Sequence, residues 1–139
     1  LVVPDELVRE EGTSYHYAPP DVRLTTSRQL NQRIRDIAAG LGVPLIEGKH
    51  WTTDAIYRET FAKVRRLAEA GVASVDMELS ALAGVAHFRK CELSAVLVIS
   101  DVVAGDHSWN GMVSPDFRLG VQRAAQIASR VFPKLLSSG

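Results

Sequence analysis

The chain has 139 residues, which is about the length of one domain and enough to bury a core. Its 16 basic and 16 acidic residues cancel, so nothing in its charge favours nucleic acid or an anionic membrane as a partner. One cysteine, Cys91, excludes an internal disulfide and favours a reducing compartment, and no apolar run approaches the roughly 20 residues of a membrane span. We therefore expect a cytoplasmic protein that binds neither nucleic acid nor membrane.

The expected elements alternate between strands and helices along the chain. The predicted strands cover residues 1–3, 43–48, 72–78 and 95–101. The predicted helices begin after Thr26 or Ser27, after Thr60, after Glu78, and after Ser114 or Asp116. Residues 4–6 suit a turn, and residues 50–54 suit a loop. This alternation predicts an α/β fold with a mixed, mostly parallel sheet flanked by helices.

Two of the predicted strands each deliver a carboxylate to the point where the chain turns. Residues 72–78 end at Glu78, where a helix follows, and residues 95–101 end at Asp101, where an irregular segment follows. Short β-branched runs of this kind are typical of buried parallel strands. If both strands belong to one sheet, right-handed crossovers place the two acids at its carboxyl edge, where open α/β sheets bind their ligands.

Glu78 has two interpretations. A carboxylate in the first turn of a helix is favoured by the free backbone N–H groups and by the helix dipole, so Glu78 could simply cap the helix. Alternatively, its two oxygens accept hydrogen bonds from a vicinal diol such as that of a ribose, with Met77 as an apolar surface against the sugar.

Asp101 also has two interpretations. It follows five apolar residues and Ser100, and an acid in such surroundings suits a general acid that must hold a proton near neutral pH. The alternative is a loop aspartate that caps a nearby backbone group, which is common at strand ends.

Several short motifs occur together in this chain. They are Val-Asp-Met-Glu at residues 75–78, Val-Ile-Ser-Asp at residues 98–101, Thr-Thr-Asp-Ala-Ile-Tyr at residues 52–57, and residues 8–14. The first resembles the ribose-binding Val-Glu-Met-Glu segment of the nucleoside phosphorylase superfamily, and the second resembles the purine-type strand of that family. The third resembles the loop that carries a base-stacking aromatic, and the fourth is most similar to the uridine phosphorylase branch. The resemblance covers nearly the whole chain.

The resemblance implies a role for each matching residue. Glu78 and Met77 would bind the ribose, and Asp101, beside Ser100, would protonate or hydrogen-bond purine N7 as the base leaves. Phosphate, as co-substrate, or water would attack the anomeric carbon while the ribose gains oxocarbenium character. No metal or other cofactor is implied.

Some positions depart from the family pattern. Asp76 is shorter than the more usual Glu and would lie near the base, and Ile56 stands where an aromatic often stacks on the base. The Gln and Arg pair that reads uracil in uridine phosphorylases has no match after Tyr57. The Ser-Asp pair therefore favours purines over uridine.

The largest departure is an absence. In the family, the phosphate-binding glycine loop and its arginines precede the segment that matches Leu1. Residues 1–139 are therefore expected to form a single partial domain, the C-terminal half to two-thirds of a nucleoside phosphorylase that is a homo-oligomer when full length. The expected reaction is phosphorolysis of a purine or uridine nucleoside to free base and ribose 1-phosphate. The alternatives are a nucleosidase, in which water replaces phosphate, and a truncated, inactive member.

Overall fold

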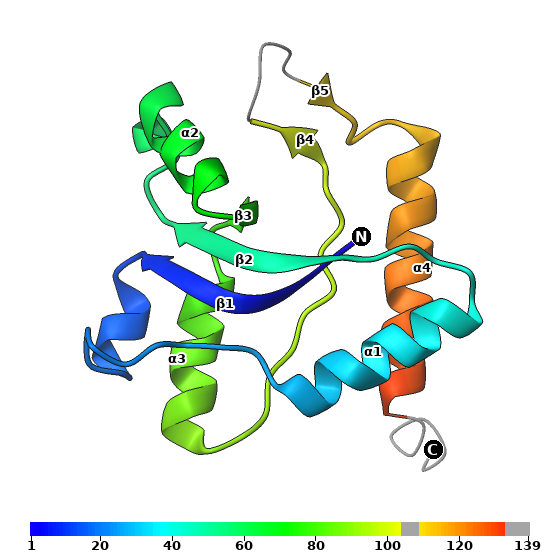
Figure 1. Cartoon of the computed structure of the whole chain (residues 1–139), viewed down its shortest axis with the longest axis horizontal. Helices are drawn as coiled ribbons and strands as arrows, with labels where there is room; N and C mark the ends of the chain where they lie inside the picture. Colours follow the sequence, from blue (N-terminus) through cyan, green and yellow to red (C-terminus); the bar gives the residue numbers. More distant parts are fainter. Residues whose placement is uncertain (104–108, 133–139) are drawn as a thin grey trace.

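The computed structural model describes residues 1–103 and 109–132, and only the backbone of residues 109 and 110. Within these residues, three parallel strands form a sheet in the order β1 (Val2–Glu10), β2 (Ile46–Thr53), β3 (Val72–Asp76). The short strands β4 (Asp101–Val102) and β5 (Trp109–Asn110) pair antiparallel, apart from that sheet (Figure 1). The predicted α/β class is confirmed.

Helices connect the parallel strands and follow them. The helices are α1 (Arg28–Gly40), α2 (Phe61–Glu69), α3 (Leu79–Arg89) and α4 (Pro115–Val131). α1 joins β1 to β2 and α2 joins β2 to β3, so each connection between neighbouring parallel strands runs through a helix (Figure 1). None of the helices in the described part of the chain is long and apolar enough to cross a membrane.

The helices α1 to α4 all begin where the sequence predicts, and three of them have a side-chain cap. The hydroxyls of Ser27, Thr60 and Ser114 accept hydrogen bonds from backbone N–H groups in the first turns of α1, α2 and α4. Two short 3-10 helices occupy the loops after β1 and β2, namely η1 (Thr13–His16) and η2 (Ile56–Arg58).

β1 contributes to two hydrophobic clusters because its register shifts between Pro4 and Leu7. One extra residue in β1 turns the following side chains to the other face of the sheet. The first cluster packs β1 against α1 and α4, and consists of Val3, Leu30, Ile34, Ala38, Ile127 and Val131. The second packs β1 against α3, and consists of Leu7, Ala18, Leu24, Leu79 and Ala83.

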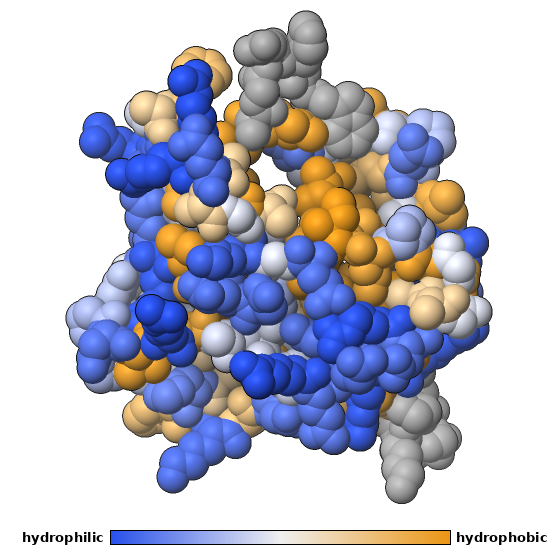
Figure 2. Space-filling model, viewed as in Figure 1, coloured by the Kyte–Doolittle hydropathy of each residue, from blue (hydrophilic) through white to orange (hydrophobic). Residues whose placement is uncertain are grey.

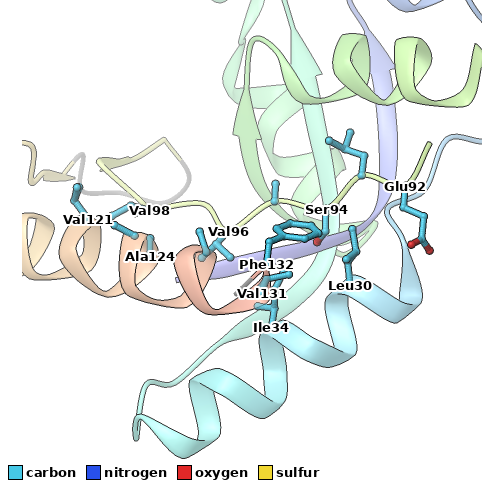
Figure 3. A pocket seen from close by; sticks show the side chains of 14 residues that line it. Leu30, Ile34, Glu92, Ser94, Val96, Val98, Val121, Ala124, Val131 and Phe132 are labelled. Carbon is cyan, nitrogen blue, oxygen red and sulfur yellow. The ribbon is translucent and has the colours of Figure 1, made fainter. Parts of the chain in front are cut away.

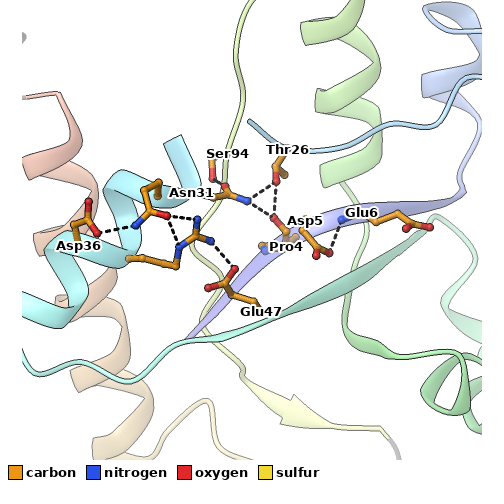
Figure 4. A network of polar contacts seen from close by, with 10 residues as sticks. Pro4, Asp5, Glu6, Thr26, Asn31, Asp36, Glu47 and Ser94 are labelled. Atoms are coloured by element: carbon orange, nitrogen blue, oxygen red, sulfur yellow. Dashed lines mark hydrogen bonds and ion pairs between the residues drawn. The ribbon is translucent and has the colours of Figure 1, made fainter. Parts of the chain in front are cut away.

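Buried polar contacts hold this irregularity in place. The Asn31 amide donates to the Pro4 carbonyl at 3.1 Å and to the Thr26 hydroxyl oxygen at 2.9 Å (Figure 4). The Thr26 hydroxyl donates to the same carbonyl at 2.6 Å, and the Ser94 hydroxyl donates to the Asn31 carbonyl oxygen. These contacts satisfy the buried polar groups and tie α1 and the chain around Ser94 to β1.

The prediction that residues 95–101 form a strand of the parallel sheet is wrong. Leu97 bridges to Val2 in the antiparallel direction, through backbone hydrogen bonds of 2.9 and 2.8 Å, and Asp101 opens β4. An apolar run indicates burial, but the direction in which a segment crosses its partner depends on contacts far away in the sequence. Right-handed crossovers between parallel strands therefore give no reason to place Asp101 at the carboxyl edge of the sheet.

Two predicted breaks are also wrong. Residues 4–6 lie inside β1, where Pro4 is tolerated at the register shift, and residues 50–53 lie inside β2. Trp51, Thr52 and Thr53 are residue types that favour strands, and all three are buried. Only Asp54 of the predicted loop follows the strand.

Candidate functional site

The carboxyl ends of β1, β2 and β3 meet at one edge of the sheet. The register pairs Glu10 with Thr53 and Thr52 with Asp76, so the three strands end at nearly the same level. The loops that carry η1 and η2 and the start of α3 follow directly from these ends. Open parallel sheets bind their ligands at this edge, which makes it the candidate site.

Asp76, the last residue of β3, is surrounded by protein donors. Its Oδ1 accepts from the Thr52 hydroxyl at 2.8 Å, and its Oδ2 accepts from the Leu79 N–H at 3.0 Å. Nε2 of His50 lies 2.7 Å from Oδ1, an ion-pair distance without the alignment of a hydrogen bond. The His50 ring is fully buried, and its Nδ1 lies 2.8 Å from the Ser74 hydroxyl oxygen.

These contacts keep Asp76 charged. Burial acts to raise the pKa of the Asp76 carboxyl, but the contacts with His50, Thr52 and the Leu79 N–H outweigh burial and hold that pKa below its usual value. Asp76 is therefore an ionised carboxylate near neutral pH.

A second carboxylate, the buried Glu11, follows β1 and holds the first turn of α3. It accepts from the Ser80 hydroxyl at 2.7 Å and from the Ser14 N–H at 2.9 Å. Burial acts to raise the pKa of Glu11, but hydrogen bonds from Ser14, Ser80 and Thr13 bring it below its usual value. Glu11 is thus also charged near neutral pH.

The two carboxylates belong to one network. The Ser80 N–H donates to the Thr52 hydroxyl oxygen at 3.0 Å, and that hydroxyl donates to Asp76. The N–H groups of Leu79 and Ser80 are therefore taken up by the protein's own oxygens. A free helix N-terminus would instead offer such groups to an anion.

Glu78 has different surroundings, although it stands two residues from Asp76. It occupies the N-cap position of α3, but its side chain caps no backbone group of the helix. Its Oε2 accepts from the Met77 N–H at 3.2 Å, and both side chains are exposed, Met77 to 45%. The capping interpretation of Glu78 is wrong, and its carboxylate is accessible to a ligand.

The loop after β2 presents large side chains to solvent. Ile56 is 56% exposed and Tyr57 is 98% exposed. Trp51 by contrast is buried, and its indole N–H donates to Glu10 at 2.7 Å, while Lys63 also donates to Glu10 at 2.6 Å. Ile56 and Tyr57, rather than Trp51, are the apolar groups that this loop offers to a ligand.

Asp101 reaches the neighbourhood of this loop by a different route from the one the sequence suggested. Desolvation raises the pKa of Glu59, the negative charges of Asp101 and Glu10 raise it further, and Lys63 partly offsets them. Asp101 therefore lies within Coulombic range of the residues that follow η2. Its Oδ1 accepts from the Ser100 hydroxyl at 2.6 Å.

The structure thus brings Asp76, Met77 and Glu78 together at the start of α3, with Ile56 in the neighbouring loop. Contact of Ser100 and Asp101 with the same ligand stays a prediction.

Sequence reasoning missed His50, Glu11 and Ser80 as members of the site. The only local signal for them was the position of Ser80 in the first turn of a helix. The described residues contain no group of three His, Cys, Asp or Glu side chains arranged for a metal ion.

A separate apolar cavity lies away from this edge. It has a volume of about 550 Å³ and opens between α1, α4 and residues 92–98 (Figure 3). Its walls are mostly aliphatic, with Phe132 as an aromatic member, and none of the predicted site residues lines it. Figure 2 shows apolar side chains around a hollow between α2 and the side of β4 and α4.

Comparison with known proteins places the chain in a family. The model of the phosphorylase superfamily matches residues 1–133, so the chain belongs to that superfamily. No curated protein sequence matches it significantly.

Solved structures share its fold. Purine nucleoside phosphorylase from Toxoplasma gondii in complex with immucillin-H has a TM-score of 0.79 at 18% identity, and the match covers 94% of this chain and 53% of that one. AMP nucleosidase from Bacteroides thetaiotaomicron has a TM-score of 0.67 at 23% identity, covering 98% and 54%. A P. knowlesi homologue of P. falciparum PNP has a TM-score of 0.69 at 18% identity, covering 96% and 53%. The chain therefore spans about half the length of these structures.

Proposed function

We propose that the protein cleaves the N-glycosidic bond of a purine or uridine nucleoside by phosphorolysis, giving the free base and ribose 1-phosphate. The observation that carries the proposal is the contrast at the start of α3. Asp76 accepts two hydrogen bonds from the protein and lies against His50, whereas the exposed Glu78 carboxylate accepts only one hydrogen bond from the residues that the structure describes. A carboxylate with free lone pairs at this edge suits two vicinal hydroxyls.

Glu78 and Met77 hold the sugar in this proposal. Each Glu78 oxygen accepts from one ribose hydroxyl, and the half-exposed Met77 side chain lies against the apolar side of the ring. Fixing the sugar in this way favours the oxocarbenium character that develops as the glycosidic bond breaks.

Asp101 serves the leaving base. It gives a proton or a hydrogen bond to purine N7, which makes the base a better leaving group. Ser100 holds Oδ1 of this carboxyl, while Oδ2 has no hydrogen-bond partner in the described ranges 1–103 and 109–132. Ile56 packs against the base in place of an aromatic ring, and its exposed side chain is available for that contact.

The phosphate must be bound by other groups. Leu79 and Ser80 at the start of α3 donate to Asp76 and Thr52, so this helix does not supply the anion site. The expectation that a glycine loop and arginines elsewhere in the fold bind phosphate agrees with this arrangement.

The homo-oligomeric state and the cytoplasmic location expected from the sequence stay predictions.

A nucleosidase is the second candidate. In that reaction water replaces phosphate, and the sugar and base groups keep the same roles. The similarity to an AMP nucleosidase favours this alternative.

Product analysis tests the proposal. The active protein is incubated with inosine or uridine, with and without phosphate, and the sugar product is identified. Ribose 1-phosphate, formed only with phosphate, is the expected result. Free ribose in the absence of phosphate would identify a nucleosidase. No release of base from either nucleoside under both conditions would contradict the proposed function.

A further inference from the structure

Asp76 has fewer free acceptor sites for a ligand than Glu78 has. Thr52 and His50 meet its Oδ1, and the Leu79 N–H meets its Oδ2, so protein groups surround both oxygens. Of the roughly four lone-pair sites of this carboxylate, two accept hydrogen bonds and a third faces His50, which leaves less for a substrate hydroxyl than at Glu78. A role exerted through its protein partners fits this arrangement better.

His50 holds Asp76 from within the sheet. The buried ring extends from the Ser74 hydroxyl oxygen, 2.8 Å from Nδ1, to Asp76 Oδ1, 2.7 Å from Nε2. The neutral tautomer with its proton on Nε2 lets Nδ1 accept from the serine hydroxyl and places the Nε2 proton beside the Asp76 carboxylate, where the contact is close but lacks the alignment of a hydrogen bond. Since the ring has no exposed surface, it cannot turn away without leaving polar groups unpaired.

Two contacts of Asp76, with Thr52 and with the Leu79 N–H, lead to the first turn of α3. Thr52 accepts from the Ser80 N–H, and Asp76 accepts from the Leu79 N–H, so the two residues after Glu78 are both fixed to the sheet. The backbone of Glu78 lies between this fixed turn and β3. The direction in which the Glu78 side chain leaves the helix therefore depends on this network.

We infer that Asp76 and His50 form a positioning pair, which with Thr52 fixes the start of α3 and so sets where the Glu78 carboxylate meets the substrate. The pair does not touch the nucleoside. This inference rests on the proposed function, and it differs from the expectation that Asp76 is itself a substrate ligand.

A double-mutant cycle tests the pair. Asp76→Asn keeps the size of the side chain but replaces one acceptor oxygen with an NH₂ group, and Glu78→Gln changes the proposed ribose ligand. KM and kcat are measured in the active protein for inosine and for 2′,3′-dideoxyinosine. Asp76→Asn should raise KM for inosine about tenfold, change it little for the dideoxy compound, and add little in the Glu78→Gln background.

The matched control is Asp36→Asn. Asp36 lies on the exposed face of α1 and accepts from Gln32, so this substitution should leave both nucleosides unaffected. Losses that add fully in the double variant, or that fall equally on the two nucleosides, would show that Asp76 contacts the substrate or acts elsewhere, and would overturn the inference.

A measurement without ligand separates this inference from the proposed function. If Glu78→Gln alone affects neither nucleoside, the ribose contact fails, and the pair is judged by amide hydrogen exchange at Leu79 and Ser80. Faster exchange in Asp76→Asn would support the pair, and unchanged exchange would overturn it. If Asp76→Asn does not fold, Thr52→Val takes its place in the double-mutant cycle and in the exchange measurement. This substitution removes one hydroxyl and keeps the shape of the side chain.

Discussion

At the scale of single residues, the surroundings of a carboxylate decide its role more than its place in a motif. Asp76 and Glu78 belong to one four-residue motif, yet one is enclosed by Thr52 and His50 and the other faces solvent. The sequence indicates both as candidate ligands. It could not separate them, because the partners of Asp76 lie on another strand and no local pattern predicts that pairing.

Removing the Glu78 carboxylate should weaken nucleoside binding. Glu78→Ala is expected to cost about 1.5–3 kcal/mol of binding free energy with a riboside, the usual scale for hydrogen bonds to a charged acceptor. The loss should be smaller with a 2′-deoxyriboside, because one of the two hydroxyls is already missing. Affinity measured for both nucleosides checks this, and equal losses on both, or no loss, would refute the diol contact.

The role of Asp101 can be tested through the leaving group. Asp101→Asn keeps the shape and removes the transferable proton, so kcat for inosine should fall about 10²–10⁴-fold, the typical contribution of general acid catalysis. The fall should be far smaller for 7-methylguanosine, whose base already carries the positive charge that protonation would create. Steady-state rates in the active protein with phosphate measure both. Equal losses on the two substrates would exclude Asp101 as the acid.

At the scale of helices and strands, the sequence predicts the helices better than the strand ends. Ser27, Thr60 and Ser114 cap their helices locally, so the starts of α1, α2 and α4 are readable from a few neighbouring residues. The register shift at Pro4 and the antiparallel bridge of Leu97 depend on distant partners, which no local pattern encodes.

The docking of α3 should make stability sensitive to acid. The pKa values of Asp76 and Glu11 lie below their usual values, so their contribution to stability is complete above those usual values and is lost as pH falls through the lowered ones. Asp76→Asn should lower the free energy of unfolding by about 1–3 kcal/mol at neutral pH and flatten its decline in acid. Urea unfolding at several pH values measures this, with Asp36→Asn as the control that keeps the wild-type profile. An unchanged acid profile in Asp76→Asn would contradict the network.

The packing of α3 on η1 requires a residue without a side chain. A Cβ at Gly84 would lie 3.0 to 3.2 Å from the Cα, Cβ and carbonyl oxygen of Ser14, which is closer than such atoms normally approach. Gly84→Ala should therefore destabilise the protein by about 1–3 kcal/mol. Gly40→Ala is the matched control, since a Cβ there meets no atom within 4 Å and the helix should gain up to about 1 kcal/mol. Chemical unfolding compares them, and equal stability of the two variants would argue against this tight approach.

At the scale of the whole molecule, the sequence predicts the α/β class and the family, while the path of residues 95–101 could not be predicted. The strand–helix alternation predicts the α/β class, and the short motifs predict the family. The apolar run before Asp101 is compatible with either strand direction, and its backbone contact is to Val2 at the other end of the chain. Desolvation and then the negative charge of Asp101 raise the pKa of Glu59, so Asp101 lies within Coulombic range of the segment after η2, and its contact with the ligand stays a prediction.

In the part of the chain that the structure describes, two candidate places for a nucleoside can be compared. One is the polar carboxyl edge of the sheet, with Glu78 exposed at the start of α3. The other is the apolar cavity of about 550 Å³ between α1 and α4, which offers few polar partners for the hydroxyls of a sugar (Figure 3). The central claim of the proposed function is that the nucleoside binds at the sheet edge and not in the apolar cavity.

A crystal structure with a non-cleavable purine nucleoside analogue tests that claim most directly. We predict that the 2′ and 3′ oxygens of the sugar lie within hydrogen-bond distance of the Glu78 carboxylate, at about 2.5–3.0 Å, with the base toward Asp101 and Ile56. An analogue bound in the apolar cavity, or one at the sheet edge with its sugar turned away from Glu78, would contradict the proposed site.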